Sequence, residues 1–355
     1  AGRATTGHHQ GALRRQHGEM AEDQLQVGPQ QPAHRFSVAP MMDCTDRHFR
    51  VLMRQITRRS LLYTEMVVAQ ALHHGRRERL LDYDPSEKPL ALQVGGDDPG
   101  LLAEAAGLAA AWGYDEINLN VGCPSEKVQK GRFGACLMAD PEQVARCVEA
   151  MAAASPLPVT VKHRIGIDER DSYAELLAFV ERVAGAGAAR FSVHARKAWL
   201  TGLDPKQNRT VPPLRYDRVH RLKQERPDLT IELNGGLQDL ETCRPHLQHL
   251  DGVMVGRAAY EHPLRWNRVD ADLFASSATS IATPSSVVCG LVPYAEQWCA
   301  SGGRLWPIAR HLVHLVEGVP GARHWRRRLG EAAGQATAGA EVLKQACREL
   351  EEQGL

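Results

Sequence analysis

Residues 90–121 read LALQVGGDDPGLLAEAAGLAAAWGYDEINLNV. This stretch holds two short apolar runs, Leu90–Val94 and Glu116–Val121, with an amphipathic segment between them. A short apolar run that ends in glycine or a polar residue is typical of a buried parallel strand, and the segment between the runs looks helical. The stretch therefore predicts a strand–helix–strand unit.

The same rhythm extends in both directions from this unit. Six further apolar runs, each followed by an amphipathic segment, begin at residues 36, 63, 158, 191, 230 and 252. Eight strands that alternate with helices over residues 34–275 match the size of a (β/α)8 TIM barrel, typically ~250 residues. A doubly wound parallel sheet is the alternative for this α/β pattern, and the number of strands favours the closed barrel.

The ends of the chain depart from this pattern. Residues 1–33 are rich in Gly, Gln, His and Arg without apolar periodicity, so we expect a disordered tail. Residues 276–286 are polar and contain proline, which is typical of a linker. Residues 287–355 have apolar periodicity and no clear strand, and they predict a small all-α helical domain.

Composition limits the classes of protein to which the chain can belong. Its 355 residues include 43 Lys+Arg and 42 Asp+Glu, a net charge of +1, with 43% hydrophobic and 24% charged residues. These values exclude wholesale disorder and a fibrous protein. They argue against a wholly basic nucleic-acid binder, although a local basic patch is compatible with them.

Signals for a membrane, for secretion and for metal binding are missing from the sequence. No run approaches the roughly 20 apolar residues of a spanning helix, and residues 1–33 contain no apolar core of a signal peptide. None of the eight cysteines forms a CxxC pair, and the His-His pairs lack convergent acidic or cysteine ligands, so we predict no metal site. We expect a reduced cytoplasmic protein that is a monomer.

The longest intervals between strands mark the candidate active-site loops. The starts of the fourth and fifth predicted strands are 42 residues apart and those of the sixth and seventh are 39 apart, against 22–33 elsewhere. Loops that follow a strand emerge at the carboxyl end of a barrel, where barrel active sites form. Residues 121–139 and 195–214 are therefore the candidate active-site loops.

Cys123 begins the first of these loops, in the sequence Asn118-Leu-Asn-Val-Gly-Cys-Pro124. A cysteine is most often a small buried hydrophobe, but this one lies between Gly122 and Pro124 at the carboxyl end of a predicted strand, a position that favours a functional role. A thiol with an ordinary pKa of about 8.5 stays protonated at neutral pH, which suits a proton donor better than a nucleophile. Cys123 is therefore a candidate proton donor.

Lys162 and His194 end the fifth and sixth predicted strands. A lysine at such a place reaches solvent, forms a Schiff base of the aldolase kind, or lies as a cation beside an electron-accepting ring that gains negative charge on reduction. A lone histidine is more often structural, although His194 could point into the barrel mouth beside Lys162. Alternation along the strand should point His163 away from the side of Lys162.

The seventh and eighth predicted strands end in Asn234-Gly-Gly236 and Gly256-Arg257. Glycines at such places either make tight turns or expose backbone N–H groups to a phosphate. Barrel phosphate sites form after these two strands, and one of the turns carries an arginine, so the pattern favours phosphate binding.

Two segments carry a local excess of positive charge. One lies at the predicted barrel mouth and has a single acid, Asp204, against Arg196, Lys197, Lys206, Arg209 and Arg215. The other lies in the predicted helical domain and has a single acid, Glu317, against Arg304, Arg310, Arg323, Arg326, Arg327 and Arg328. A solvated surface is the usual fate of such residues, but two patches with Trp325 beside one of them favour contact with nucleic-acid phosphates.

Seven motifs together resemble the tRNA-dihydrouridine synthases. They are Val38-Ala-Pro-Met-Met-Asp-Cys-Thr-Asp46, Leu92-Gln-Val-Gly-Gly96, Asn118-Leu-Asn-Val-Gly-Cys-Pro124, Val161-Lys-His-Arg164, Val193-His-Ala-Arg196, Asn234-Gly-Gly236 and Val255-Gly-Arg257. Two longer motifs, His194-Ala-Arg-Lys-Ala-Trp-Leu-Thr-Gly-Leu203 and Gly321-Ala-Arg-His-Trp-Arg-Arg327, resemble subfamily A in particular. The resemblance covers residues 34–350 in order.

The resemblance implies an FMN-binding barrel and a helical domain that contacts tRNA. It makes Cys123 the proton donor. The residues that it assigns to FMN are Pro40, Met41, Met42, Gln93, Lys162, His194, Asn234, Gly235, Gly236, Gly256 and Arg257. The residues that it assigns to the tRNA substrate are Asn120, Arg164, Lys206, Arg209, Arg323 and Arg326, of which Asn120 would help to hold the target uracil.

The implied reaction reduces the C5=C6 bond of uridines in the tRNA D-loop, at positions 20 and 20a, to 5,6-dihydrouridine. Reduced FMN would supply a hydride from N5, Cys123 would supply the proton, and NADPH, or less readily NADH, would reduce the flavin. The alternatives are a tRNA-binding module without catalysis, an FMN oxidoreductase that acts on a free pyrimidine, and a Schiff-base aldolase. Retention of Cys123, Lys162 and the phosphate turns argues against the first, and the basic helical domain has no use in the second.

Overall fold

The structure, a computed structural model, describes residues 30–277 and 280–355. Of the tail expected over residues 1–33, all but residues 30–33 lies outside this range. Residues 31–355 form one compact unit with a single nine-stranded sheet. Its strands are β1 (Phe36–Val38), β2 (Leu62–Tyr63), β3 (Val67–Val68), β4 (Leu90–Gly95), β5 (Glu116–Val121), β6 (Val159–Arg164), β7 (Arg190–His194), β8 (Ile231–Asn234) and β9 (Gly252–Val255).

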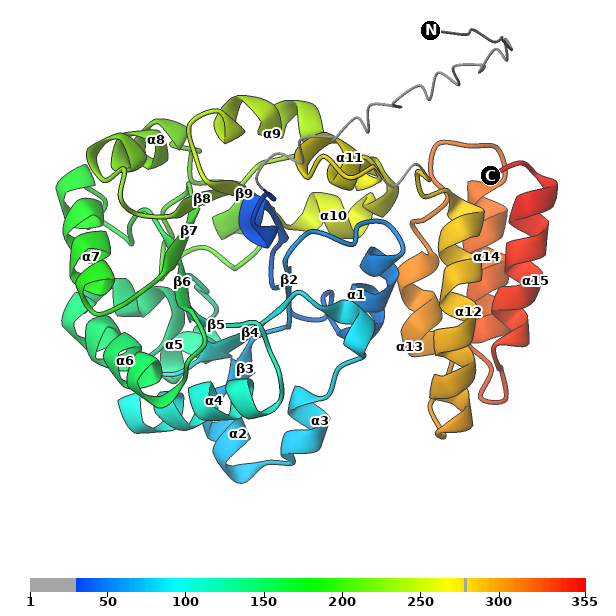
Figure 1. Cartoon of the computed structure of the whole chain (residues 1–355), viewed down its shortest axis with the longest axis horizontal. Coiled ribbons are helices and arrows are strands. Elements are labelled where there is room, and N and C mark those ends of the chain that lie inside the picture. The colour runs from blue at the N-terminus through cyan, green and yellow to red at the C-terminus, as the bar shows by residue number, and fades with distance from the viewer. Residues whose placement is uncertain (1–29, 278–279) are drawn as a thin grey trace, which may run out of the picture. The chain divides into compact units, whose positions relative to one another are not determined.

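The sheet closes on itself, as Figure 1 shows. Every strand pair is parallel, and the order runs β1-β9-β8-β7-β6-β5-β4-β2, with β3 also paired to β4. A parallel bridge between Ser37 and Leu61 joins the two ends of this series. The predicted (β/α)8 barrel is therefore confirmed, with one correction. The second predicted strand, from residue 63 to 67, is two short strands, because only its ends pair with β4.

Helices cover the outside of the barrel. They are α1 (Arg47–Arg54), α2 (Ala69–His74), α3 (Arg77–Leu81), α4 (Pro99–Ala111), α5 (Glu126–Lys130), α6 (Pro141–Ala154), α7 (Tyr173–Gly185), α8 (Tyr216–Glu225), α9 (Leu240–Leu247), α10 (Arg257–Glu261) and α11 (Val269–Leu273). Aspartates begin α4 and α6, where the side chains of Asp98 and Asp140 each accept a hydrogen bond from the backbone N–H three residues later. Proline at the first helical position supports both starts.

Alternation along β5 places its apolar side chains outside the barrel and its polar side chains inside. In β5, Ile117 and Leu119 are buried within the apolar core that includes the surrounding helices, while Glu116, Asn118 and Asn120 hydrogen-bond to residues of neighbouring strands. His163 follows the same rule. Its ring packs against Phe179 of α7 and Phe191, on the opposite side of β6 from Lys162, as the sequence predicts.

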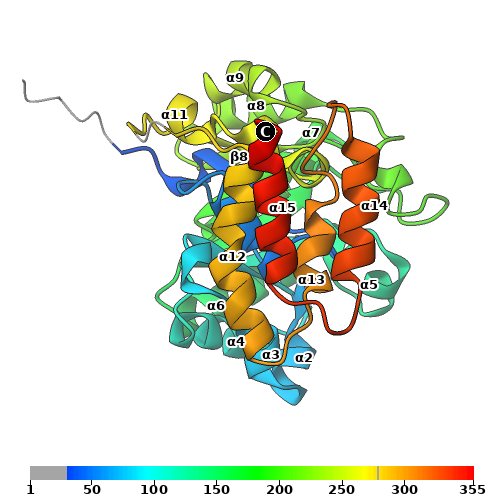
Figure 2. The ribbon, with the colours of Figure 1, turned by 90° about the vertical axis from the view of Figure 1, so that its right-hand side faces the viewer.

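The described part of the chain after the barrel contains helices and no strand. It contains α12 (Pro284–Ala300), α13 (Trp306–Ala309), the 3-10 helix η6 (Arg310–Leu312), α14 (Ala322–Ala333) and α15 (Glu341–Glu352). Figure 2 shows α12, α14 and α15 side by side. Helix α12 begins inside the segment predicted to be a linker, because Thr283 caps it and Pro284 follows the cap. A disulfide joins Cys289 of α12 to Cys347 of α15, a bond of which the cysteine spacing gives no sign.

The helical segment contacts the barrel through α1. Asp46, the N-cap residue of α1, accepts hydrogen bonds from Arg310 (2.7 Å) and His311 (2.8 Å) of η6. Tyr294 of α12 contacts the first turn of α1, where its hydroxyl lies 2.7 Å from Nδ1 of His48 and 3.1 Å from Nε of Arg47. Polar contacts therefore tie both α12 and η6 to α1, and η6 also contacts α10, where the Tyr260 hydroxyl lies 3.2 Å from Nδ1 of His311.

Among the described residues, no helix is both long enough and apolar enough to cross a membrane.

Candidate active site

A cavity of about 640 Å³ opens at the carboxyl end of the barrel strands. It is lined by residues from both loops that the strand intervals singled out, among them Cys123 and Arg209. Among the residues that the structure describes, no aspartate or glutamate lines the cavity, whereas five cationic side chains do: Lys127, Lys162, Arg164, Arg209 and Arg257. A cavity with this charge favours an anionic ligand.

Cys123 is held by its backbone at the edge of this cavity. Its N–H donates to Oδ1 of Asn120 at 2.9 Å, and its carbonyl oxygen accepts from the N–H of Ala135 at 2.9 Å. Gly134 is required beside it, because φ there is +72° and a Cβ atom would lie 2.6 Å from the Cys123 carbonyl oxygen. The thiol, 3.6 Å from Oγ of Ser125, is half-buried and lines the cavity.

Lys162 and His194 lie on neighbouring strands and both line the cavity. Among the described residues, neither side chain has a hydrogen-bond or ion-pair partner. Burial, and then the nearby Arg164, lower the pKa of Lys162 to about 8. Burial also lowers the pKa of His194 well below its usual value, assisted by Arg164 and Lys162, so its imidazole is neutral at neutral pH.

The two glycine turns expose unused hydrogen-bond donors to the cavity. Gly235 and Gly236 have φ of +116° and +70°, a conformation that glycine adopts without strain. In the part of the chain that the structure describes, no acceptor bonds the backbone N–H of Gly235, Gly236 or Gly256, and the Arg257 guanidinium also lacks a partner. Asn234 steadies the first turn by donating from Nδ2 to the carbonyl oxygen of Met254 at 2.9 Å. Free N–H groups beside an unpaired arginine fit a phosphate.

The segment Pro40–Met42 forms an apolar wall of the same cavity. The N–H of Met41 is already bonded to Oγ1 of Thr45 at 3.0 Å, whereas Met42 is 57% exposed. Gln93 lies at the cavity floor, where its Oε1 accepts from Nδ2 of Asn120 at 3.1 Å. The cavity therefore brings together every residue that the sequence analysis assigned to FMN.

The six residues assigned to tRNA fall into two groups. Asn120, Arg164 and Arg209 line the cavity, and Arg164 also donates to the carbonyl oxygens of Gly122 and Asn208 at 2.9 and 3.0 Å. Arg164 thereby ties both active-site loops to the barrel. Lys206, Arg323 and Arg326 are exposed and do not line the cavity; Lys206 lies next to η4 (Gln207–Arg209) and the two arginines lie on α14.

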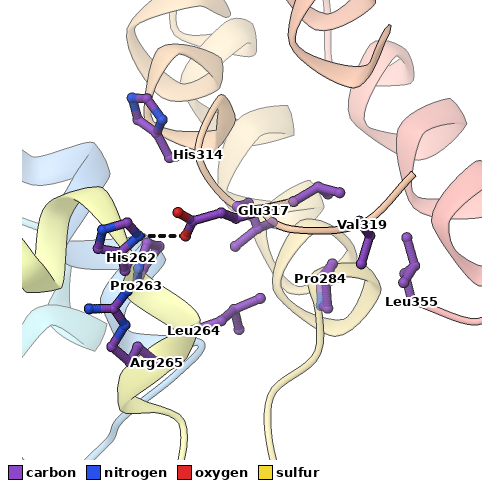
Figure 3. Close-up of a pocket in the computed structure, with 11 residues that line it drawn as sticks. His262, Pro263, Leu264, Arg265, Pro284, His314, Glu317, Val319 and Leu355 are labelled. Atoms are coloured by element: carbon purple, nitrogen blue, oxygen red, sulfur yellow. Dashed lines mark hydrogen bonds and ion pairs between the residues drawn. The ribbon is translucent and has the colours of Figure 1, made fainter. Parts of the chain in front are cut away.

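A second cavity of about 190 Å³ lies between the end of α10 and the loop that precedes α14 (Figure 3). Nδ1 of His262 and the carboxylate of Glu317 form an ion pair across it. None of the predicted site residues lines this cavity, so it is not an extension of the candidate active site. It lies where the barrel meets the helical segment.

Comparison with known proteins identifies the family. The model of the family described as "Dihydrouridine synthase (Dus)" matches residues 37–351. The chain belongs to the dihydrouridine synthase family.

Three similar proteins share the printed name "tRNA-dihydrouridine(20/20a) synthase". The protein of that name from Synechocystis sp. is 57% identical over 310 residues, which cover 87% of this chain and 92% of the relative. Those from Shewanella oneidensis and Escherichia coli K12 are each 53% identical, over 89% and 88% of this chain and 94% and 91% of the relative. These relatives support the resemblance to subfamily A.

A solved structure is similar to this dihydrouridine synthase in fold alone. The 2-naphthoyl-CoA reductase in complex with 2-naphthoyl-CoA superposes with a TM-score of 0.51 at 8% identity, over 68% of this chain and 51% of the other. The likeness agrees with the barrel topology described above.

Sequence reasoning missed several residues of the dihydrouridine synthase cavity. Cys44 stands in a quoted motif but received no role, and it lines the cavity as a second thiol. Lys127 and Phe133 line it from the first active-site loop. Their place in that long loop was the available signal, since a loop at the carboxyl end of a barrel tends to contribute to its site.

Proposed function

We propose that this chain is an FMN-dependent tRNA-dihydrouridine synthase that reduces uridines 20 and 20a of the D-loop to 5,6-dihydrouridine, with NADPH or NADH as electron source. Family membership and the name printed for its relatives support the reaction. The observation that carries the proposal is the cavity itself. It has cations without carboxylates, a half-buried thiol at its edge, and an apolar wall.

Members of this family depend on a flavin, and the cavity residues fit FMN. The unused N–H groups of the two glycine turns, with Arg257, would hold its phosphate. The apolar segment Pro40–Met42 would face its ring system, and Gln93 would hydrogen-bond its pyrimidine end. Lys162 would provide the cation beside that end, since a buried ammonium without a partner is stabilised by an approaching negative charge.

Saturation of the uracil C5=C6 bond needs a hydride at C6 and a proton at C5. When bound, the reduced flavin is the source of that hydride. Cys123 donates the proton to C5 from its thiol, and Asn120, which fixes the backbone N–H of Cys123, also holds the uracil. His194 stays neutral beside Lys162 and therefore adds no second positive charge there.

Unpaired cations indicate where the tRNA lies. Of the five cations in residues 195–215, Arg196, Lys197 and Arg215 bond to groups of the protein, which leaves Lys206 and Arg209 without a described partner. Of the six arginines in residues 304–328, four bond to described residues, and those left without a described partner are Arg323 and Arg326. Unpaired cations are available to phosphates, and we propose that these four contact the tRNA backbone.

Reconstitution with purified components tests the proposal. The protein is loaded with FMN, supplied with NADPH and given an unmodified tRNA transcript, and the product is digested and mapped by mass spectrometry. We expect a mass increase of two hydrogens at D-loop uridines. A protein that binds tRNA but no flavin would be a binding module. Reduction of free uracil or uridine but not of tRNA would indicate a free-pyrimidine oxidoreductase, and borohydride trapping of a substrate on Lys162 would indicate an aldolase.

A further inference from the structure

A line of hydrogen bonds crosses the barrel interior from its amino end to the cavity. At its base, Arg190 donates to both oxygens of Glu116, at 2.9 and 2.7 Å. Burial disfavours the charged guanidinium, but Glu116 and the neighbouring acids outweigh it and raise the pKa of Arg190 above its usual value. Because both oxygens of Glu116 accept from the Arg190 guanidinium, a group that only donates, Glu116 is the acceptor at the base of the line.

This acceptor sets the direction of each bond above it. Oγ1 of Thr160 donates to Glu116 at 2.7 Å and hence accepts from Nδ2 of Asn118 at 2.9 Å. Asn118 then turns Oδ1 toward Nε2 of Gln93 at 2.9 Å, and Gln93 turns Oε1 toward Nδ2 of Asn120 at 3.1 Å. Because a hydroxyl has one proton and an amide has distinct donor and acceptor ends, no member of the line reverses alone.

The upper end of the line demands the same direction independently. Oδ1 of Asn120 accepts from the backbone N–H groups of Gly122 and Cys123, at 3.0 and 2.9 Å. A backbone N–H only donates, so Asn120 must turn its nitrogen toward Gln93. Both ends therefore hold the Gln93 amide in the same one of its two orientations.

We propose that Thr160 and Asn118 are positioning residues that transmit the acceptor character of the Glu116 carboxylate to the Gln93 amide. Both are fully buried, and neither lines the cavity, so they act only through Gln93 and Asn120. The inference rests on the proposed function in one respect, since it takes Gln93 and Asn120 as the amides that meet the flavin and the uracil.

A fixed amide recognises a pyrimidine edge by its pattern of donors and acceptors. If the Gln93 amide turned over, a donor would face a donor and the buried group would stay unpaired, which is costly. A site built in this way rejects ligands with the opposite pattern. The line from Glu116 therefore contributes to selectivity for the flavin ring without touching it.

Threonine variants separate the direction of these bonds from simple packing. Thr160→Val keeps the side-chain shape but removes the hydroxyl, and Thr160→Ser restores it. Thr57→Val is the matched control, because Thr57 is also fully buried and donates to a carboxylate, Asp270, at 2.6 Å, but lies outside the cavity. We expect FMN to bind Thr160→Val about tenfold more weakly in a fluorescence titration of the flavin-free protein.

The remaining readouts tell positioning from destabilisation. Thr160→Val should lower kcat while KM for tRNA changes by less than about twofold, since phosphate contacts dominate tRNA affinity. Thr160→Ser should bind FMN with the affinity of the wild type. Thr57→Val should lower thermal stability and leave FMN affinity unchanged. Equal FMN affinity of Thr160→Val and wild type, or equal losses in Thr160→Val and Thr160→Ser, would overturn the proposal.

A measurement on the unmodified protein needs neither flavin nor activity. In nitrogen-15 NMR spectra of the flavin-free protein, the side-chain amides of Gln93 and Asn118 should each give one pair of signals, with slow hydrogen exchange. Two sets of signals for Gln93 would contradict a single orientation. If the wild type neither binds flavin nor forms dihydrouridine, the proposed function fails, while these spectra still decide whether the amides are fixed.

Discussion

The backbone contacts around Cys123 explain how its thiol comes to face the cavity. The Asn120 side chain and the Ala135 N–H hold its N–H and its carbonyl oxygen, so the thiol cannot withdraw without breaking both bonds. Because the contacts are to the backbone, replacement of the side chain should leave the loop in place. The role of the thiol can therefore be tested separately from the structure of the loop.

Cys123→Ala should bind FMN like the wild type and form dihydrouridine about 10²–10⁴-fold more slowly, the range for loss of a general acid. Flavin absorbance measures the first quantity, and single-turnover reaction of the reduced protein with tRNA measures the second. Cys299→Ala, on α12, is the control and should keep full activity. If Cys44→Ala stopped the reaction and Cys123→Ala did not, the proton donor would be the other thiol of the cavity.

Lys162 predicts a dependence of flavin affinity on pH. Its pKa lies near 8, below that of free lysine, so the ammonium loses its proton from about pH 8 upward. Since the flavin and its phosphate attract the protonated form, FMN affinity should fall as pH rises past about 8. Titrations at several pH values measure it. Lys162→Met should bind FMN more weakly and lose the change of affinity near pH 8. Lys223→Met is the control and should keep that change, because Lys223 lies outside the cavity. If the change persisted in Lys162→Met, another group would cause it.

The N-terminus of α1 joins the apolar cavity wall formed by Pro40–Met42 to the helical segment. Asp46 caps α1 through the N–H of Phe49, and Arg310 donates both to Asp46 and to the carbonyl oxygen of Asp43, just after Met42. Burial by itself raises the pKa of Asp46, but the hydrogen bonds from His311, Phe49 and Arg310 outweigh it and lower that pKa. The ionised carboxylate is therefore favoured in the folded protein.

Asp46→Asn should lower the free energy of unfolding by about 2 kcal/mol at neutral pH, because it removes charge-assisted hydrogen bonds. A carboxyl with a lowered folded pKa stabilises the protein above its unfolded pKa, about 3.9, and this contribution disappears as pH falls below that value. Urea denaturation at several pH values should therefore show a difference between variant and wild type that shrinks toward acid. Asp82→Asn, which removes an exposed partner of Arg47, should cost less than about 1 kcal/mol. A constant difference at all pH values would contradict the role of the charge.

Strands with a clear apolar run could be predicted, and those without one could not. The apolar run from Leu90 predicts β4, because both faces of a barrel strand are buried and such a strand is mostly apolar. The split between β2 and β3 is invisible in residues 63–67, since it depends on how β4 pairs with each end. Similarly, the start of α12 at Pro284 follows from a cap at Thr283 that lies in an otherwise polar stretch.

At the scale of the molecule, the distribution of charge separates structural cations from available ones. Composition shows only a net charge near zero. Within the two charged segments, residues 195–215 and 304–328, the structure leaves four basic residues without a described partner: Lys206, Arg209, Arg323 and Arg326. These are the four cations outside Arg164 that the family resemblance assigned to tRNA. The sequence could not show which cations are unpaired, because the partners of other arginines come from distant segments, as Asp46 does for Arg310.

Arg323→Ala/Arg326→Ala should weaken tRNA binding and make it less dependent on salt, with a slope smaller by about one unit for each phosphate that the variant no longer neutralises. Filter binding over a range of KCl concentrations measures both. NADPH oxidation by the flavin-loaded protein should not change, since neither arginine lines the cavity. Arg348→Ala, on the exposed surface of α15, is the control. A joint decrease of tRNA binding and NADPH oxidation would mean that the two arginines support the fold.

Part of the set of residues that line the cavity could be predicted from the sequence, for a physical reason. Residues at strand ends, such as Lys162 and Asn234, converge once the barrel closes, so counting strands suffices to place them. The interior line through Thr160 and Asn118, and the cluster around Asp46, depend on side-chain directions across several strands and helices. No pattern along a single segment records such contacts.

The most direct measurement of the central claim maps dihydrouridine in tRNA from cells that lack the gene for this chain, by mass spectrometry of digested individual tRNAs. The account predicts that D-loop positions 20 and 20a carry uridine in these cells, that the wild-type chain restores dihydrouridine there, and that the Cys123→Ala chain does not. Unchanged dihydrouridine at both positions in the absence of the gene would contradict it.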